Sequence, residues 1–318
     1  MFLEKAFTFQ NHFWKYIVGT IIVAITTFIG QLPLLLAVIM KLNDEGKNML
    51  ELDESSLMAV LEQNTTLFLM LLSFAVTLLG LILVLRLFHK QRLKDITTGR
   101  PKTDWGRIGF AFGIWAVFQA VATLINYNVS PEDFVWNFKL EPFLILLAVG
   151  TIMIPIQTST EEYFFRGYLM QGFGLIAKNR WLPLIMTSVI FGGLHYFNPE
   201  VAKMGPIIMI YYIGTGLFLG IITLMDDGLE LALGFHAANN LITALLVTSE
   251  WTAFQTHSVL KDISEPSAGY EIIVPVLVIF PLLLFIFAKK YGWSNWKNKL
   301  TGVITEPNSE AIEFIQND

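Results

Sequence analysis

Two adjacent glutamates and an arginine interrupt an otherwise apolar part of the sequence. Glu161, Glu162 and Arg166 fall within six residues of the stretch "TEEYFFRGY". On a helix, Glu162 and Arg166 are four residues apart and can form an ion pair. Glu161 points about 100° away around the axis and has no partner in its own helix. This spacing predicts that Glu162 anchors the helix with Arg166, whereas Glu161 is available as a general base. The alternative is a plain surface ion pair where a helix leaves a membrane.

Two histidines lie at the edges of other apolar runs. His195 follows Phe191 by four residues in "VIFGGLHYF", so both share a helix face, and the two glycines between them allow another helix to approach closely. His236 precedes Asn240 by four residues in "LGFHAANNLI". Either histidine alone could equally be a packing residue bonded to a backbone carbonyl. The remaining histidines fall at a terminus or in loops, and we expect them to be solvated: His12, His89 and His257.

Together these groups could activate a water molecule for hydrolysis. Glu161 could take a proton from the water. His195 could orient the water or protonate a leaving amine. His236 and Asn240 could donate hydrogen bonds to an oxyanion, a form of stabilisation that is usually a large part of catalysis.

The composition indicates that membrane helices must position these residues. Of the 318 residues, 54% are hydrophobic and only 15% are charged, against about 25% charged in an average globular protein. The apolar residues come in blocks near the ~20 residues that a membrane span needs, and backbone groups in lipid must be satisfied within the segment. We therefore predict an all-α, polytopic membrane bundle of about eight helices, at 16–40, 65–88, 107–126, 141–158, 182–197, 205–225, 230–248 and 271–289.

The distribution of positive charge predicts that both termini are cytoplasmic. The stretch 86–107 is strongly basic, whereas 41–64 is acidic. With both termini inside, only 5 of the 21 lysines and arginines lie outside: Lys41, Lys47, Lys139, Lys203 and Lys261. The first apolar run is too long for a signal-peptide core and has no cleavage site after it, so we expect a retained span. A short amphipathic helix is expected within 50–63, on the outer face.

The chain divides by composition into three parts. Residues 1–104 form a two-span extension with an acidic outer loop and a basic cytoplasmic loop. Residues 105–290 form the core with the polar motifs, and 291–318 form a polar cytoplasmic tail.

The formal net charge of −5 provides no basic face for nucleic acid. The absence of cysteine excludes disulfides, cysteine zinc sites and thiol catalysis.

At the three polar motifs, the sequence resembles the CAAX protease and bacteriocin-processing (CPBP, or Abi) family of intramembrane endopeptidases. Its signature is a diglutamate followed after three residues by arginine, then Phe-xxx-His, then His-xxx-Asn or Asp. The same pattern occurs here in order at 161–166, 191–195 and 236–240. The resemblance covers about 140–250 by motif and 105–290 by general layout. It implies a multi-helix membrane protein whose site is reached from the cytosolic side.

The resemblance also implies a role for each matched residue. Glu161 corresponds to the catalytic glutamate, Glu162 with Arg166 to a structural pair, and His195 to the second catalytic residue. His236 and Asn240 correspond to the oxyanion-stabilising pair, and Phe191 is a supporting residue. Members of the family cleave prenylated CAAX proteins or are linked to bacteriocin maturation and self-immunity. Nothing in this chain indicates a prenyl substrate, so the resemblance extends to proteolysis of a membrane-associated protein or peptide, and CAAX specificity is not carried over.

The sequence leaves the metal question open. Glu161, His195 and His236 could hold a single zinc ion with one position open for water. No His-Glu-x-x-His helix is present, however, and the spacing offers no local clamp of two histidines. A glutamate-activated water without a metal is therefore the favoured interpretation.

Two other functions use the same residues. A catalytically silent family member could act by binding, as a bacteriocin-immunity or scaffold protein. A transporter or proton relay is a further alternative, because pumps also carry buried glutamate and histidine. We favour the endopeptidase because three polar motifs occur in order on separate apolar helices.

Overall fold

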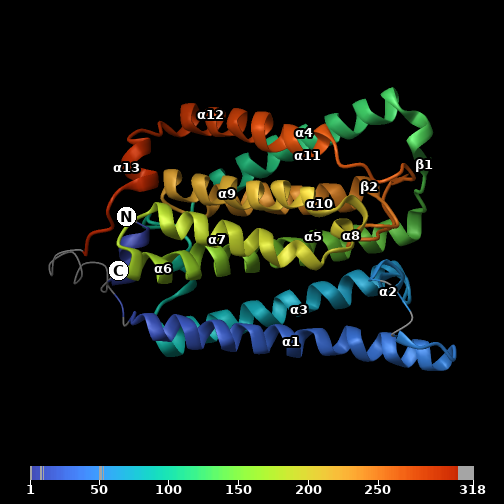
Figure 1. Cartoon of the computed structure of the whole chain (residues 1–318), viewed down its shortest axis with the longest axis horizontal. Helices are drawn as coiled ribbons and strands as arrows, with labels where there is room; N and C mark the ends of the chain where they lie inside the picture. The colour runs from blue at the N-terminus through green and yellow to red at the C-terminus, as the bar shows by residue number, and fades with distance from the viewer. Residues whose placement is uncertain (1, 8, 10, 50–51, 53, 307–318) are drawn as a thin grey trace.

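The protein is a bundle of long, roughly parallel helices in a computed structural model that describes residues 2–7, 9, 11–49, 52 and 54–306 (Figure 1). The helices are α1 (Phe13–Asp44), α2 (Glu54–Met58), α3 (Gln63–Val84), α4 (Trp105–Val129), α5 (Leu140–Glu162), α6 (Met170–Ala177), α7 (Trp181–Leu194), α8 (Pro199–Met204), α9 (Met209–Asp226), α10 (Glu230–Leu246), α11 (Tyr270–Val274), α12 (Phe280–Tyr291) and α13 (Trp296–Thr301).

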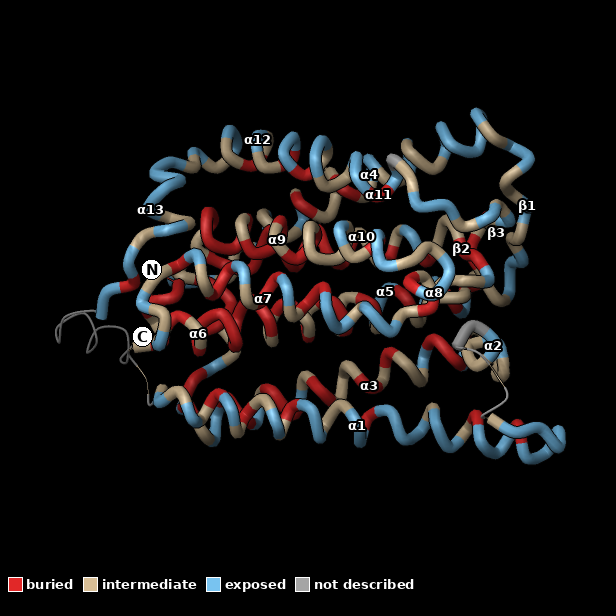
Figure 2. The backbone as a smooth tube through the Cα atoms, in the orientation of Figure 1, coloured by how far each residue is buried: buried red, intermediate tan, exposed pale blue. Residues whose placement is uncertain are grey.

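The expected helical membrane bundle is confirmed. Six helical segments in the described residues are long and apolar enough to cross a membrane: 13–44, 63–89, 105–129, 140–177, 206–226 and 271–291. The other two expected spans correspond to shorter helices, 181–197 and α10. The outer helices expose large apolar side chains; Phe28 on α1 is 72% exposed. Figure 2 shows the buried residues concentrated on the inner helices, as a bundle in lipid requires.

The fourth span is longer than predicted. The expected boundary at residue 158 is wrong, because α5 continues without a break through a π-helical segment, η6 (Tyr163–Leu169), into α6. The resulting helix covers 38 residues. The apolar sequence after Glu162 permits this continuation within the membrane. Glu161 and Glu162 therefore lie in the interior of a long helix instead of at its end.

The structure adds a small sheet that the sequence did not indicate. Strands β1 (Phe134–Trp136), β2 (Val247–Thr248) and β3 (Leu260–Asp262) pair in the order β1-β3-β2, with β1 antiparallel and β2 parallel to β3. The sheet lies at the end of the bundle that also carries α2 (Figure 1).

Helix α2 is shorter than the helix expected within 50–63, because residues 59–62 are not helical. Residues 50, 51 and 53 lie outside the described part of the chain.

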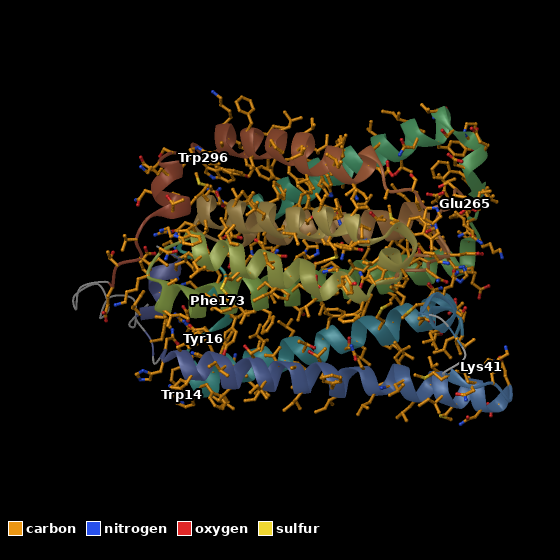
Figure 3. All side chains as sticks on the ribbon, viewed as in Figure 1. Trp14, Tyr16, Lys41, Phe173, Glu265 and Trp296 are labelled. Carbon is orange, nitrogen blue, oxygen red and sulfur yellow. The ribbon has the colours of Figure 1, made fainter. Side chains whose placement is uncertain are left out.

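Both ends of the described chain lie together at the opposite end of the bundle (Figure 1). The short helix η1 (Leu3–Phe7) is buried there, and Glu4 forms an ion pair with Arg180. Ile304 is buried nearby, and its N–H donates to the carbonyl of Lys178 at 3.0 Å. Figure 3 places Trp296 and Trp14 at this end and Lys41 and Glu265 at the other. An even number of crossings requires this arrangement. The cytoplasmic side and the three-part division of the chain stay predictions.

Part of the basic stretch packs against an acidic turn instead of lying free in solvent. Arg100 contacts Asp226 at 2.9 Å and Glu230 at 3.2 Å, and Arg107 contacts Asp226 at 2.6 Å. Both acids are almost fully buried. The start of α4 is thereby tied to the turn between α9 and α10, which fixes the N-terminal end of α10.

His89 is buried, so the prediction that it is solvated is wrong. Its Nδ1 lies 2.6 Å from Asn11 Oδ1, and its Nε2 lies 3.1 Å from the hydroxyl of Tyr168. The second span continues through a π-helical turn, η3 (Leu85–His89), before most of the basic stretch begins. Its last residue therefore faces α1 and η6. His12 is exposed as expected, whereas His257 is only partly exposed and lies 2.7 Å from Glu62.

One of the two glycines between Phe191 and His195 permits a close helix contact. A Cβ added at Gly192 would lie 2.8 Å from the backbone nitrogen of Ile213 on α9, whereas a Cβ at Gly193 would meet nothing within 4 Å. The expectation of close approach therefore holds for Gly192 alone. Gly216 on α9 makes the matching approach, because its added Cβ would lie 2.8 Å from the Ser188 carbonyl oxygen.

We predict that Gly192→Ala lowers the stability of the bundle and that Gly193→Ala does not. At residue 192 the methyl group meets backbone that must move, at a cost of about 1–3 kcal/mol. At residue 193 alanine has space, and a helix favours it over glycine by about 0.5–1 kcal/mol. Thermal unfolding of both variants in the same detergent compares them. Equal unfolding temperatures would contradict the close packing of α7 on α9.

Candidate active site

The ion pair between Glu162 and Arg166 forms as the spacing predicts. Arg166 Nη1 lies 2.9 Å from Glu162 Oε1, and both side chains are fully buried. Arg166 Nη2 also donates to the Gly216 carbonyl at 3.2 Å. The pair lies where α5 passes into η6, and π-helical turns occur often at functional sites. Because Arg166 reaches a backbone carbonyl of α9, it fixes the rotation of this helix within the bundle.

His236 on α10 lies between the two glutamates. Its Nδ1 is 2.8 Å from Glu162 Oε1, and its Nε2 is 3.4 Å from Glu161 Oε2. The sequence predicted separate roles for the two acids, but one imidazole joins them. The Nδ1 contact is a short hydrogen bond, whereas the Nε2 distance is long for one. At that distance the Coulomb interaction is still substantial in a buried site.

The protonation of this cluster follows from its hydrogen-bonding groups. If Nδ1 donates to Glu162, the Nε2 of a neutral ring is an acceptor and faces the Glu161 carboxylate. Two acceptors in contact repel, so one proton must lie on Nε2 or on Glu161. With that proton, two carboxylates, Arg166 and His236 sum to zero charge. A net charge of zero lowers the cost of burying these four groups in an apolar bundle.

Three buried polar atoms of this cluster have no hydrogen-bond partner in the described part of the protein: Glu161 Oε2, Glu162 Oε2 and Arg166 Nε. A buried polar atom without a partner costs about 1–3 kcal/mol. Thr160, the neighbour of Glu161, donates to the Phe74 carbonyl of α3 at 3.1 Å. The glutamates are thus held rigidly while part of their hydrogen-bonding capacity is left unused.

Phe191 is the apolar centre around which the motifs meet. The guanidinium of Arg166 lies over its ring, with Cζ 4.2 Å from the centroid. The rings of His195 and His236 lie 4.8 Å and 6.0 Å from the same centroid. One aromatic side chain therefore contacts all three of the predicted motifs.

Among the described residues, His195 is linked to the cluster through its ring contact with Phe191. It lies just past the end of α7, and its Nδ1 is 2.8 Å from the Phe191 carbonyl oxygen. A carbonyl can only accept, so Nδ1 carries the hydrogen and the Nε2 of the neutral ring is an acceptor. The ring stacks on Tyr212 with centroids 4.5 Å apart. No hydrogen bond joins His195 to Glu161 or His236 among the residues described.

A partly buried acid that the sequence analysis missed, Glu200, lies near His195. Glu200, on α8, accepts a hydrogen bond from Ala253 N–H at 2.9 Å. Burial raises the pKa of Glu200, and the Ala253 hydrogen bond and the nearby His195 oppose that shift. The only sequence signal is its place at the start of a short helix after a proline, which is common for any acidic residue.

Asn240 faces Gln157 across the same two helices. Asn240 Nδ2 donates to Gln157 Oε1 at 3.0 Å. Gln157 lies four residues before Glu161, and Asn240 lies four residues after His236, so this contact is one helical turn from the glutamate–histidine contact. The sequence analysis missed Gln157, although its spacing from Glu161 on an apolar helix is a usable signal.

The zinc site considered at Glu161, His195 and His236 stays a prediction from the sequence. No group of three or more histidines and acids in the described ranges is arranged to hold a metal ion. His195 uses Nδ1 on a backbone carbonyl, and both nitrogens of His236 face carboxylates. Of the three residues, Glu161 and His236 contact each other at 3.4 Å, whereas no hydrogen bond or ion pair joins His195 to either of them among the residues described.

Comparison with known proteins matches the part of the chain that carries these residues. Residues 139–242 match the family model described as type II CAAX prenyl endopeptidase Rce1-like. A relative from Bacillus subtilis (strain 168), "Uncharacterized protein YyaK", is 30% identical over 294 residues, covering 91% of this chain and 95% of its own. The chain belongs to the Rce1-like (CPBP) family. No solved structure matches it.

Membership of the Rce1-like family confirms the resemblance predicted from the three motifs. The matched range contains Glu161, His195, His236 and Asn240, together with Gln157. It omits the first 138 residues, whereas the alignment with the Bacillus protein extends over 91% of this chain. The helices outside the matched range are therefore largely shared with at least this relative.

We predict that Arg166→Met destabilises the protein strongly. The change leaves Glu162 fully buried without its arginine, and breaking a buried ion pair by removing one partner costs about 3–5 kcal/mol. Thermal unfolding in detergent measures the loss. Arg86→Met is the matched control, because Arg86 is exposed and such a change is usually within about 0.5 kcal/mol. Similar unfolding temperatures for the two variants would contradict the anchoring role.

Proposed function

We propose that this protein is an intramembrane endopeptidase in which Glu161 activates the water that attacks a peptide bond. The observation that carries the proposal is the contact of Glu161 and Glu162 with one histidine, His236, in the interior of an apolar bundle. Ionisable groups in membrane helices are costly and mark functional sites. Membership of the Rce1-like family supports a peptidase.

Glu161 is the group best suited to the base. Glu162 is occupied by Arg166 at 2.9 Å and by His236 at 2.8 Å. Glu161 has only the longer contact at 3.4 Å, and its side chain is 15% exposed whereas that of Glu162 is fully buried. Glu161 can therefore meet a substrate or a water, and Glu162 cannot.

In the proposed reaction, Glu161 takes one proton from water while the water oxygen bonds to the scissile carbonyl carbon. The carbonyl oxygen becomes an oxyanion. The proton on Glu161 then passes to the leaving nitrogen as the carbon–nitrogen bond breaks, directly or through Nε2 of His195. The products are a carboxylic acid and an amine, which ionise to a carboxylate and an ammonium, and no further reactant is required.

We assign the stabilisation of the oxyanion to His236 and Asn240. They lie four residues apart on one face of α10, and Asn240 has a second Nδ2–H besides the one donated to Gln157. Protonation of Glu161 removes the negative charge that faces His236 Nε2. The Nε2–H is then released to the oxyanion at the step when that charge develops.

The substrate class follows from the surroundings of the site. All of its helices belong to a bundle with lipid-facing apolar surfaces. A protein or peptide that is itself associated with the membrane reaches such a site most readily. The proposal covers proteolysis and makes no claim about CAAX specificity.

We predict that Glu161→Gln reduces cleavage by about 10²–10⁴-fold, the usual contribution of a general base. The full chain in lipid nanodiscs is incubated with a mixed library of prenylated and unmodified peptides, and cleavage is read by mass spectrometry. Glu45→Gln, a change of the same type in an exposed loop, is the control.

The same preparations separate the alternatives. Full cleavage by Glu161→Gln would overturn the assignment of the base. Absence of cleavage by the wild-type chain, with proton flux into liposomes that Glu161→Gln abolishes, would indicate a proton relay. Absence of both, with immunity or partner binding unchanged in Glu161→Gln, would indicate a silent binding protein.

A further inference from the structure

A chain of side-chain hydrogen bonds runs from the indole of Trp115 on α4 to Gln157 on α5. Trp115 Nε1 donates to Asn239 Oδ1 at 3.1 Å. Asn239 Nδ2 donates to Asn240 Oδ1 at 3.0 Å, and Asn240 Nδ2 donates to Gln157 Oε1 at 3.0 Å. Trp115 and Gln157 are each only 4% exposed. The chain therefore joins three helices through three carboxamides in a mostly buried setting.

The indole determines the direction of every bond in this chain. A carboxamide alone can face either way, because its oxygen accepts and its nitrogen donates. An indole N–H can only donate, so Asn239 must turn its oxygen to Trp115 and its nitrogen to Asn240. Asn240 must then accept with its oxygen and donate to Gln157. The oxygen of Gln157 accepts this last hydrogen bond, and the nitrogen of Gln157 has no acceptor within the chain of amides.

The two amide donors that the chain does not use lie beside Glu161, the proposed base. Gln157 precedes Glu161 by four residues on α5, so the two side chains share a helix face. Gln157 Nε2 donates to no described residue. The second N–H of Asn240 is the other unused donor, on the facing helix α10. The chain thus ends in two neutral donors next to Glu161, the type of group that stabilises an oxyanion without adding a buried charge.

We propose that Gln157 is a third oxyanion donor besides His236 and Asn240, and that Trp115 and Asn239 are positioning residues that orient the amides of Gln157 and Asn240. This inference rests on the proposed endopeptidase function. The competing explanation is that the chain only holds α4, α5 and α10 together. A purely structural chain would work equally well with its direction reversed, whereas an oxyanion site would not.

Asn239→Asp reverses the direction of the chain. Both carboxylate oxygens of aspartate accept, so Trp115 keeps its partner but Asn240 must turn its nitrogen towards residue 239. Asn240 then presents its oxygen to Gln157, which turns its nitrogen to Asn240 and its oxygen towards the substrate. All the contacts persist, but an acceptor replaces a donor at the site.

The test compares Asn239→Asp with Gln119→Glu in the full chain in nanodiscs, using a peptide that the wild-type chain cleaves from the mixed library. Gln119 Nε2 donates to the backbone carbonyl of Asn239 and to Thr243. Gln119→Glu therefore places a new negative charge beside residue 239 without entering the chain of amides.

We expect Asn239→Asp to lower kcat by about 10²–10³-fold, the effect of losing one oxyanion donor, with KM within about threefold. Gln119→Glu should keep kcat within about threefold of wild type. Trp115→Phe, which removes the donor and leaves the direction free, should cost only about twofold if the two directions become equally populated.

A kcat for Asn239→Asp equal to that of Gln119→Glu, in an assay where Glu161→Gln is inactive, would overturn the amide chain and leave the proposed function standing. Absence of cleavage by the wild-type chain would overturn both. If Asn239→Asp fails to fold, the kcat of Gln157→Met is measured instead. This variant removes the donor without adding charge, and an unchanged kcat would overturn the role of Gln157.

Discussion

The buried pair of Glu162 and Arg166 is the interaction on which the geometry of the site depends. Charges in a low-dielectric interior are tolerated only when they are paired and hydrogen-bonded. Here the pairing extends beyond the local helix, because Arg166 also bonds to α9 and Glu162 also bonds to His236 of α10. Burial of one ion pair therefore sets the relative positions of three helices.

That constraint explains the departures from regular helix around the pair. Arg166 is buried only because α5 continues past Glu162 into a π-helical segment instead of ending at the membrane surface. Its bond to the Gly216 carbonyl requires α9 to lie close to η6, and α7 must approach the same part of α9. The glycines at 192 and 216 permit that approach, since a Cβ at either position would collide with backbone. Small residues serve here as they do at many membrane-helix interfaces, where close backbone contact replaces the hydrophobic effect.

The sequence predicted the parts of the site that depend on spacing within one helix. Glu162 with Arg166, Phe191 with His195, and the shared face of His236 and Asn240 all follow from the helical repeat. The apolar blocks predicted the spans from their length, since a span needs about 20 apolar residues. What spacing could not provide is the rotation of one helix against another. For that reason the contact of His236 with both glutamates, the burial of His89 and the bond between Gln157 and Asn240 appeared only in three dimensions.

The two contacts between α5 and α10 differ in electrostatic type, and this difference bears on how the site can work. The contact through Glu161, Glu162 and His236 is ionic, and its total charge changes when one proton arrives or leaves. The contact through Gln157 and Asn240, one helical turn away, is neutral and has no proton to exchange at ordinary pH. Proton transfer at the first contact therefore alters the field at the second without altering its hydrogen bonds. A fixed set of dipoles next to a group that changes its charge is the arrangement that electrostatic stabilisation of a transition state requires, because no reorganisation is needed at the moment of reaction.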